Sequence, residues 1–315
     1  MQLRHLGHSG LRVSRLGLGT MTWGRDTDEH EARDQLIAFA EAGGTLVDTA
    51  AAYAEGASER MLGALIGDVM AREEIVIATK AGLEARDGRL RYDTSRRALL
   101  AGLDASLRRL GVDHVDLWQV HTWHDGAPLE ETLAALDQAV TSGRAVYTGI
   151  SNYSGWQTAR AATWQTAVPG RTPIASTQVE YSLLNRDIEL EVLPAARALG
   201  LGVLPWSPLG RGVLTGKYRT GTPSDSRAAT SQFSRFVSHY LDDRAAGIVE
   251  GVARAAEGLG WTPAEVALVW VRDRPGVTAP IVGARTATQL RATLSVEELA
   301  LPPEITEALD DVSAD

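Results

Sequence analysis

The segment "EIVIATKAGLEARDGRLRYDTSRRALLAGLDASLRRLGVDHVDLWQVH", residues 74–121, decides the fold, because it reads as a strand, a helix and a second strand in succession. The apolar runs at 74–82 and 114–121 are nearly continuous, which is typical of parallel strands buried on both faces. Residues 93–110 between them begin with an Asp/Thr cap, have helical periodicity and end at Gly111. The segment is therefore predicted to be a β-α-β unit.

The same unit recurs along the chain. Strand candidates lie at 15–21, 45–50, 74–82, 114–121, 145–152, 174–181, 201–209 and 276–284. Amphipathic helices are predicted at 28–42, 58–71, 93–110, 128–142, 154–166, 187–199, 242–259, 262–273 and 286–294. Eight strand-helix units predict a single α/β domain over residues 1–315, a (β/α)8 TIM barrel, with a doubly wound sheet as the alternative.

Two segments depart from this regularity. "LRHLGHSGLRVS", residues 3–14, is predicted to be an N-terminal β-hairpin that turns at Ser9-Gly10 and closes the barrel bottom. Residues 210–243 form a long stretch rich in Gly, Ser, Thr and Arg after the seventh strand. A loop of this length in a compact domain is usually functional, so we expect a lid here.

Composition excludes several classes of function. The chain has 315 residues, a formal net charge of -9 and dispersed charges, which disfavours nucleic acid and membrane surfaces as partners. No long apolar segment occurs near the start, so we expect a cytoplasmic protein. The absence of cysteine excludes disulfides, thiolate catalysis and Cys-ligated zinc.

The basic residues are strongly biased. Of 31, only Lys80 and Lys217 are lysines. The pKa of a lysine ammonium responds to burial, whereas a guanidinium stays charged almost everywhere. Lys80 follows an apolar strand and is therefore a candidate for chemistry.

Polar residues cluster where the predicted strands end, which is where a barrel builds its site. Asp48, Lys80 and His121 close three successive strands, and Tyr53 lies in the loop after the first of these. A lysine beside a tyrosine favours the phenolate and lowers the tyrosine pKa, while an aspartate stabilises the lysine. Such a tyrosine is a general acid or base, and the histidine could orient a carbonyl oxygen. The set is suited to proton transfer.

The ordered motifs along the chain resemble the aldo-keto reductase family from about Leu3 to Leu294. The motifs are "LGLGTMTWG", "DTAAAYAEGASERMLG", "IATKAG", "DLWQVH", "GISNYS", "TQVEYSLLNR", "PWSPLGRGVLTGKY" and "IVGARTATQL". The chain is most similar to the bacterial branch related to potassium-channel β-subunits. The resemblance implies a TIM barrel, NADPH/NADP+ as cofactor, and reduction of a small-molecule carbonyl substrate to an alcohol.

The resemblance also implies roles for the rim residues. Tyr53 is the acid that protonates the carbonyl oxygen, Lys80 lowers its pKa, Asp48 pairs with Lys80, and His121 positions the substrate. Further residues of the substrate pocket are then Trp23 and, from its place in a strand-end loop, Trp123.

The implied cofactor contacts follow the same strand ends. Those beside the nicotinamide are Gly19, Thr20, Met21, Asp48, Ser151, Asn152, Gln178 and the stacking ring of Trp206. Those toward the pyrophosphate are Ser207, Pro208, Leu209, Gly210, Gly212, Leu214 and Lys217, with Arg227 in a clasp over the cofactor. Those at the start of the last barrel helix are Gly283, Arg285, Thr286 and Gln289, of which Arg285 and Gln289 are expected at the 2′-phosphate. Ala292 and Thr293 replace the Glu-Asn pair with which many relatives contact adenine.

The sequence also has two alternative interpretations, a metal site and a regulatory module. His121 and His124 are three residues apart, but no further histidine-rich set accompanies them, and no metal is predicted. The second interpretation is an NADPH-binding regulatory module of channel β-subunit type with slow residual reductase activity. The intact set of Asp48, Tyr53, Lys80 and His121 favours the enzyme. The oligomeric state is not predicted from the sequence.

Overall fold

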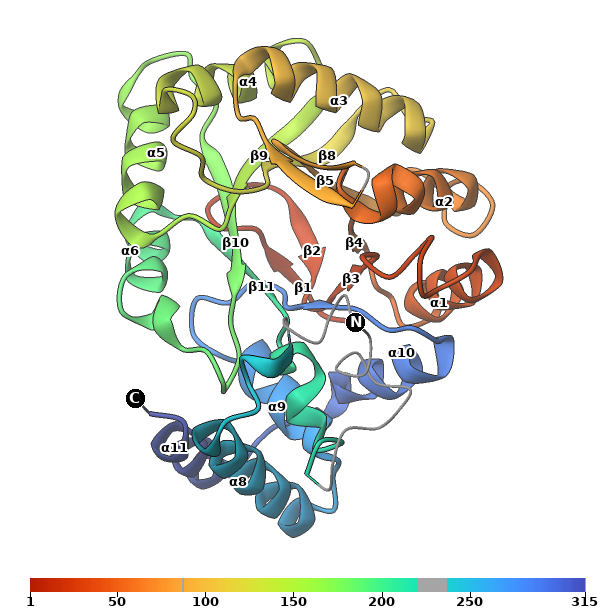
Figure 1. Ribbon diagram of the computed structural model, residues 1–315, viewed down its shortest axis with the longest axis vertical. Coiled ribbons are helices and arrows are strands. Elements are labelled where there is room, and N and C mark those ends of the chain that lie inside the picture. The colour runs from red at the N-terminus through yellow and green to blue at the C-terminus, as the bar shows by residue number, and fades with distance from the viewer. Residues whose placement is uncertain (87, 220–236, 315) are drawn as a thin grey trace.

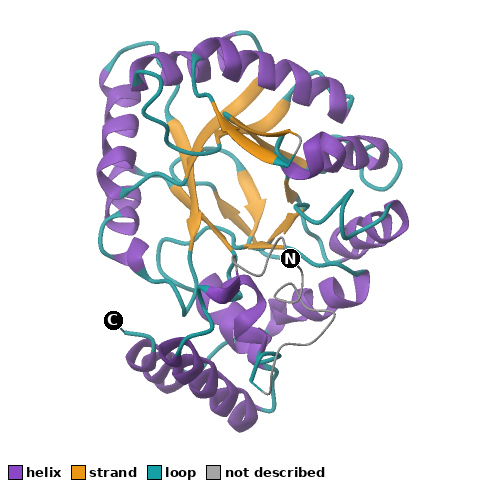
Figure 2. Ribbon diagram, in the orientation of Figure 1, coloured by secondary structure: helices purple, strands orange, loops and turns teal. Residues whose placement is uncertain are grey.

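The computed structural model describes residues 1–86, 88–219 and 237–314, and within these residues eight parallel strands close into a barrel. The strands occupy the centre of Figure 1, and Figure 2 shows the helices packed around them. They are β3 (Gly17–Gly19), β4 (Leu46–Asp48), β5 (Val76–Ala81), β8 (Val115–Val120), β9 (Ala145–Ser151), β10 (Ile174–Glu180), β11 (Gly202–Trp206) and β12 (Ile281–Val282). The predicted TIM barrel is confirmed, and the doubly wound alternative is wrong.

Helices join the strands and cover the outside of the barrel (Figure 1). They are α1 (Glu29–Glu41), α2 (Ala57–Leu65), α3 (Arg96–Leu110), α4 (Leu129–Thr141), α5 (Gly155–Ala167), α6 (Val192–Leu199), α8 (Asp243–Leu259), α9 (Pro263–Arg272) and α10 (Ala287–Leu294). Their ends have ordinary local causes. The Ser95 side chain accepts a hydrogen bond from Ala98 N at the start of α3, and Gly111 ends the helix at φ 68°.

The N-terminal hairpin closes one end of the barrel. β1 (Leu3–His5) and β2 (Arg12–Ser14) pair antiparallel, with Leu3 opposite Ser14, as the sequence predicted. Leu6 and Val13 are fully buried and share a hydrophobic cluster with Leu46, Ala78, Leu117 and Leu204 from the strands. The hairpin therefore fills the end opposite the strand C-termini, and the site can lie only at the other end.

Several elements were not predicted or begin elsewhere. A second hairpin, β6 (Leu83–Arg86) with β7 (Arg89–Tyr92), follows β5, and a final helix, α11 (Pro303–Val312), packs on α8. Short 3-10 turns, η1 (Tyr53–Gly56), η2 (Asp187–Glu189), η3 (Gly210–Thr215) and η5 (Ser295–Glu298), complete the fold. The strand predicted at 276–284 is interrupted: Val277 forms an isolated parallel bridge with Val203, and β12 contains Ile281 and Val282. Pro280 lies between them and has no N–H to donate.

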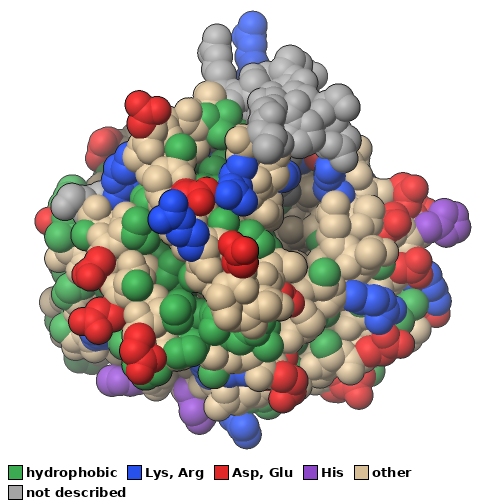
Figure 3. All heavy atoms as spheres, turned by 90° about the horizontal axis from the view of Figure 1, so that it is seen from below, with side chains coloured by type: hydrophobic (Ala, Val, Ile, Leu, Met, Phe, Trp, Pro, Cys, Tyr) green, Lys and Arg blue, Asp and Glu red, His purple; other side chains and the backbone are tan. Residues whose placement is uncertain are grey.

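The surface in Figure 3 has acidic and basic side chains interspersed among apolar ones, with no continuous patch of either sign. This agrees with the dispersed charges of the sequence. Within the three described ranges, no helix is both long and apolar enough to span a bilayer.

Leu6→Ala is expected to lower the free energy of unfolding by about 3 kcal/mol, because it opens a cavity in the closed end of the barrel. Leu90→Ala is the matched control, since Leu90 is 57% exposed on the second hairpin. Denaturant unfolding followed by circular dichroism measures both changes. Equal effects of the two substitutions would contradict the role given to the hairpin.

Candidate active site

A buried ion pair lies at the rim where β4 and β5 end. Lys80 Nζ is 2.6 Å from Asp48 Oδ2 and donates a second hydrogen bond to the carbonyl oxygen of Thr49, at 3.0 Å. The Lys80 and Asp48 side chains are 1% and 2% exposed. A buried charge pair is stable only when its remaining hydrogen-bonding positions are also filled. The pair is therefore built into the barrel wall rather than placed on its surface.

Tyr53 and His121 complete the group that the sequence predicted. Lys80 Nζ lies 3.4 Å from the Tyr53 hydroxyl oxygen, and the Tyr53 and His121 rings meet edge to face at 6.0 Å. Tyr53 belongs to η1 after β4, while His121 directly follows β8. The structure thus brings four side chains from three strand ends to one point of the rim.

Burial changes the ionisation of Tyr53 from the sequence expectation. Burial raises the pKa of the Tyr53 phenol, and the opposing effect of the Lys80 ammonium does not reverse that rise. Lys80 thus lowers the Tyr53 pKa, as the sequence predicted, but burial outweighs this effect, so the pKa stays above its ordinary value. The phenol keeps its proton at neutral pH, which suits a proton donor. Burial lowers the pKa of Lys80, but Asp48 and Tyr53 together raise it by more, so the pKa lies above its ordinary value and the ammonium stays charged.

His121 is a neutral imidazole in this environment. Burial first, and the nearby Lys80 ammonium second, lower its pKa to about 3. Its Nδ1 atom is buried with no hydrogen-bond partner within the described part of the chain. A neutral ring can donate one N–H to an oxygen without competing as an acid.

Two glutamines bind the other oxygen of Asp48. Gln178 Nε2 donates to Asp48 Oδ1 at 2.8 Å, and Gln119 Nε2 reaches the same atom at 3.5 Å. Gln119 is fully buried and lies opposite Lys80 in the strand register. The sequence reasoning missed Gln119. A polar residue inside the apolar run 114–121, two positions before His121 and hence on the same strand face, was the available signal.

The first rim loop has a different arrangement from the predicted one. The helix predicted at 58–71 is α2, which begins at Ala57 with Gly56 as its N-cap and ends at Leu65. The Ser58 hydroxyl lies 2.7 Å from the Thr20 hydroxyl and 3.0 Å from that of Thr49. Trp23 was predicted in the substrate pocket. It is fully buried in the core and its indole N–H donates to Gln35 at 2.9 Å, so it has no surface for a substrate to contact.

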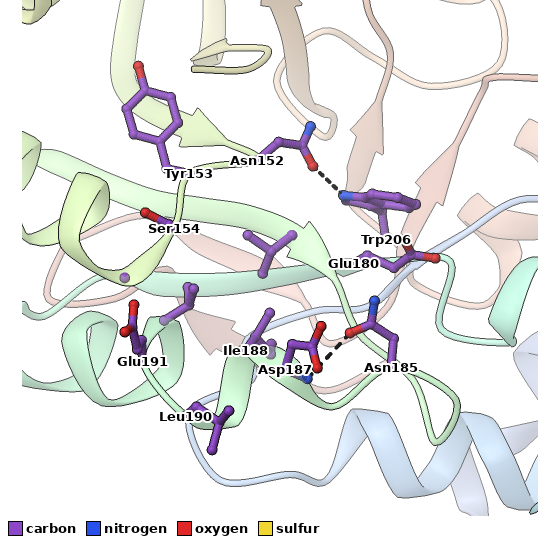
Figure 4. A pocket seen from close by; sticks show the side chains of 13 residues that line it. Asn152, Tyr153, Ser154, Glu180, Asn185, Asp187, Ile188, Leu190, Glu191 and Trp206 are labelled. Carbon is purple, nitrogen blue, oxygen red and sulfur yellow. Dashed lines mark hydrogen bonds between the residues drawn. The ribbon is translucent and has the colours of Figure 1, made fainter. Parts of the chain in front are cut away.

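Several of the residues expected near the nicotinamide form hydrogen bonds with one another or with the neighbouring strand ends. Asn152 accepts a hydrogen bond from Trp206 Nε1 at 2.9 Å and donates to the backbone oxygen of His121, also at 2.9 Å. Ser151 Oγ donates to the backbone oxygen of Gln178. Asn152 and Trp206 also form one wall of a pocket of about 470 Å³, seen in Figure 4. The strand ends β8, β9, β10 and β11 are thereby linked in order around the rim.

The loop after β11 has the geometry of an anion cradle. Gly210, Arg211 and Gly212 all have left-handed backbone, with φ between 54° and 91°. A Cβ at Gly212 would lie 3.2 Å from Lys217 Nζ, so glycine leaves room for the ammonium beside the loop. Left-handed turns of this kind form concave surfaces that bind phosphate oxygens. Arg227, also predicted to contact the cofactor, lies outside the described residues.

The start of α10 is already partly capped. Thr286 accepts a hydrogen bond from Gln289 N, and Gln289 Oε1 accepts one from Arg285 N at 3.0 Å. The Glu31 carboxylate accepts from Ala287 N at 2.7 Å, so protein groups use these first-turn donors. Within the described ranges the Arg285 guanidinium has no hydrogen bond or ion pair, which makes it the available cation at this end.

Metal binding finds no support in the described ranges, where no group of three or more His, Asp or Glu side chains is arranged around an ion. His124 stacks on Tyr92 at 5.9 Å and accepts a hydrogen bond from Gly126 N, so it is occupied within its own loop. Trp123 packs edge to face on Tyr153 and Trp156 at the same rim.

A closed parallel barrel with a Tyr, Lys, Asp and His group at the C-terminal rim of its strands has the arrangement of a TIM-barrel enzyme. A model of the Aldo/keto reductase family matches residues 15–314. The chain belongs to this family, whose members are typically NAD(P)H-dependent.

Full-length relatives support the assignment. The chain is 37% identical to "Uncharacterized oxidoreductase YrpG" of Bacillus subtilis, over 99% of this chain and 96% of the relative. It is 35% identical to "Probable voltage-gated potassium channel subunit beta" of rice, over 99% and 96%. It is 34% identical to "L-glyceraldehyde 3-phosphate reductase" of Escherichia coli K12, over 95% and 91%.

His121 predicts a specific loss of stability in acid. Its pKa is about 3 in the folded protein and near 6.5 when unfolded, so the unfolded state binds the extra proton between these values. The stability that neutral His121 provides is complete above pH 6.5 and is lost as pH falls, by on the order of 3 kcal/mol at pH 4.

Denaturant unfolding at pH 7 and pH 4 tests this for His121→Asn and for the control His30→Asn, which replaces an exposed histidine on α1. We expect the loss of unfolding free energy between pH 7 and pH 4 to be smaller than in the wild type only for His121→Asn. The same loss in both variants would show that His121 is not buried in its neutral form.

Proposed function

We propose that the protein is an NADPH-dependent reductase that converts aldehydes or ketones to alcohols. The observation that carries the proposal is the Lys80 ammonium, 2.6 Å from Asp48 and 3.4 Å from the Tyr53 hydroxyl. This geometry places a protonated phenol beside a fixed positive charge at an open rim. It suits an acid that must deliver a proton to a carbonyl oxygen and then stabilise its own anion.

Each side chain has one task in this reaction. Tyr53 donates its phenolic proton to the carbonyl oxygen, and Lys80 stabilises the phenolate that forms. Asp48 keeps Lys80 protonated, while neutral His121 donates a hydrogen bond that orients the carbonyl. The nicotinamide supplies the hydride to the carbonyl carbon when it is bound. The proton and the hydride together convert the carbonyl to an alcohol.

The chain has residues suited to each part of the dinucleotide. The left-handed loop 210–212 and the neighbouring Lys217 suit the pyrophosphate. The guanidinium of Arg285, which has no hydrogen bond or ion pair to the residues that the structure describes, suits the 2′-phosphate that distinguishes NADPH from NADH. Trp206 presents an aromatic ring at the end of β11, next to Asn152. These groups span the rim in the order that an extended dinucleotide requires.

A regulatory role is the second candidate, because the rice relative carries the name of a channel subunit. The E. coli relative is named for the reduction of a small phosphorylated aldehyde. The assembled Asp48, Tyr53, Lys80 and His121 group favours the enzyme, since binding alone needs no proton donor. We propose a screen of small aldehydes, dicarbonyls and sugars under NADPH to find the substrate.

Tyr53→Phe is expected to lower kcat for a test aldehyde at least about a hundredfold, because it removes the proton donor. The affinity for NADPH, measured by isothermal titration, should stay unchanged. Tyr147→Phe is the control, since Tyr147 packs at the hairpin end of the barrel. A Tyr53→Phe variant with the wild-type rate would refute Tyr53 as the proton donor. A wild-type protein that binds NADPH but reduces none of the screened carbonyls would favour the regulatory role.

Arg285→Ala is expected to weaken NADPH binding about tenfold and to leave NADH binding nearly unchanged, because only NADPH carries the 2′-phosphate. Arg291→Ala is the matched control on α10, the helix that follows Arg285, since Arg291 is 55% exposed and pairs with Glu41. Isothermal titration of both nucleotides gives the ratio of NADPH affinity to NADH affinity in each variant. Parallel loss of NADPH and NADH affinity would contradict a 2′-phosphate contact at Arg285.

A further inference from the structure

Arg211 occupies a strained position in the loop after β11. Its φ is 59°, between Gly210 at 54° and Gly212 at 91°. Left-handed backbone favours glycine, because a Cβ there crowds the neighbouring carbonyl. If the loop needed only its backbone shape, a third glycine would be the least strained residue. The arginine side chain must therefore contribute something that the backbone cannot.

The Arg211 side chain forms an ion pair with Glu180, at the end of β10. Arg211 Nε and Nη2 donate to the two carboxylate oxygens of Glu180 at 2.8 and 2.6 Å. The two side chains are 13% and 12% exposed. A two-point guanidinium-carboxylate pair fixes both distance and orientation. Because Glu180 already neutralises it, Arg211 is poorly placed to serve as the phosphate ligand, which leaves that task to Lys217.

The Arg211–Glu180 pair encloses Trp206. Glu180 is the last residue of β10 and lies opposite Trp206 in the strand register. The Arg211 guanidinium carbon is 5.9 Å from the Trp206 ring centroid and 4.9 Å from that of Tyr240, whose hydroxyl also donates to Glu180. Figure 4 shows Glu180 beside Trp206, with the indole N–H directed at Asn152. The ring is thus held from two sides.

We propose that Arg211 is a positioning residue for the nicotinamide and pyrophosphate half of the dinucleotide. It acts through Trp206 and the loop 210–216 and does not touch the cofactor itself. The inference rests on the proposed function, because it takes NADPH as the ligand. It predicts a selective effect: the adenosine end, bound near Arg285, should be indifferent to Arg211.

The test compares two ligands by isothermal titration with the full chain. NADPH contains both halves, whereas adenosine 2′-monophosphate contains the adenosine end with its 2′-phosphate and lacks both the pyrophosphate and the nicotinamide. Arg211→Met and Glu180→Gln break the pair, and Arg211→Gly removes the side chain while relieving the backbone strain. Arg171→Met is the matched control, since Arg171 also pairs with a carboxylate, that of Asp137, and lies 5.3 Å from the ring of Trp164.

We expect Arg211→Met, Arg211→Gly and Glu180→Gln to weaken NADPH binding about tenfold through lost preorganisation, with the affinity for adenosine 2′-monophosphate changed by less than about twofold. Arg171→Met should change neither. Wild-type NADPH affinity in Arg211→Gly overturns the proposal, and so does an equal loss for both ligands. If Arg211→Met does not fold, Arg211→Gly and Glu180→Gln decide.

The outcome for the wild-type protein separates this inference from the proposed function. A wild-type chain that fails to bind NADPH refutes the proposed cofactor and, with it, the role of Arg211. Wild-type binding combined with unaltered Arg211→Gly binding refutes the positioning role alone.

Discussion

The ion pair between Lys80 and Asp48 is the interaction on which the rest of the site depends. Taking two charges out of water costs several kcal/mol per ion unless every remaining hydrogen-bonding position is filled. Here Thr49, Gln178 and Gln119 fill those positions, from the ends of β4, β10 and β8. Only a closed barrel brings these strand ends to one point. The ion pair can therefore stay charged only in a barrel that has closed.

The support for Tyr53 comes from outside the barrel. The two residues after Tyr53 have left-handed backbone, and Gly56 then leads into α2. The Arg109 side chain passes directly under Gly56, where a Cβ would lie 2.7 Å from Arg109 Cδ, and ends on the fully buried Glu59 at 2.6 Å. Glu59 also accepts from Thr79, the neighbour of Lys80 on β5. One buried carboxylate thus joins the tyrosine loop to the lysine strand.

The sequence predicted the barrel and the meeting of its rim residues, because buried parallel strands give continuous apolar runs and place their ends on one side. It could not predict which way a loop side chain turns. Trp23 packs in the core, although its position after a strand is typical of a site residue. Ser58 hydrogen-bonds the hydroxyls of Thr20 and Thr49, although its position is typical of a helix start. The sequence also did not predict that the net pKa of Tyr53 is raised, because the effect of burial can be judged only from coordinates. Helix α11 was missed because it lies beyond the eight-unit repeat.

The two lysines of the chain differ completely in chemical accessibility. Lys80 is 1% exposed, whereas Lys217 is exposed on the loop after β11. An acylating reagent applied to the native fold would thus find one reactive side-chain amine among the 31 basic residues. Because nearly all basic residues are arginine, a label on a side-chain amine would report from a single place, the loop after β11.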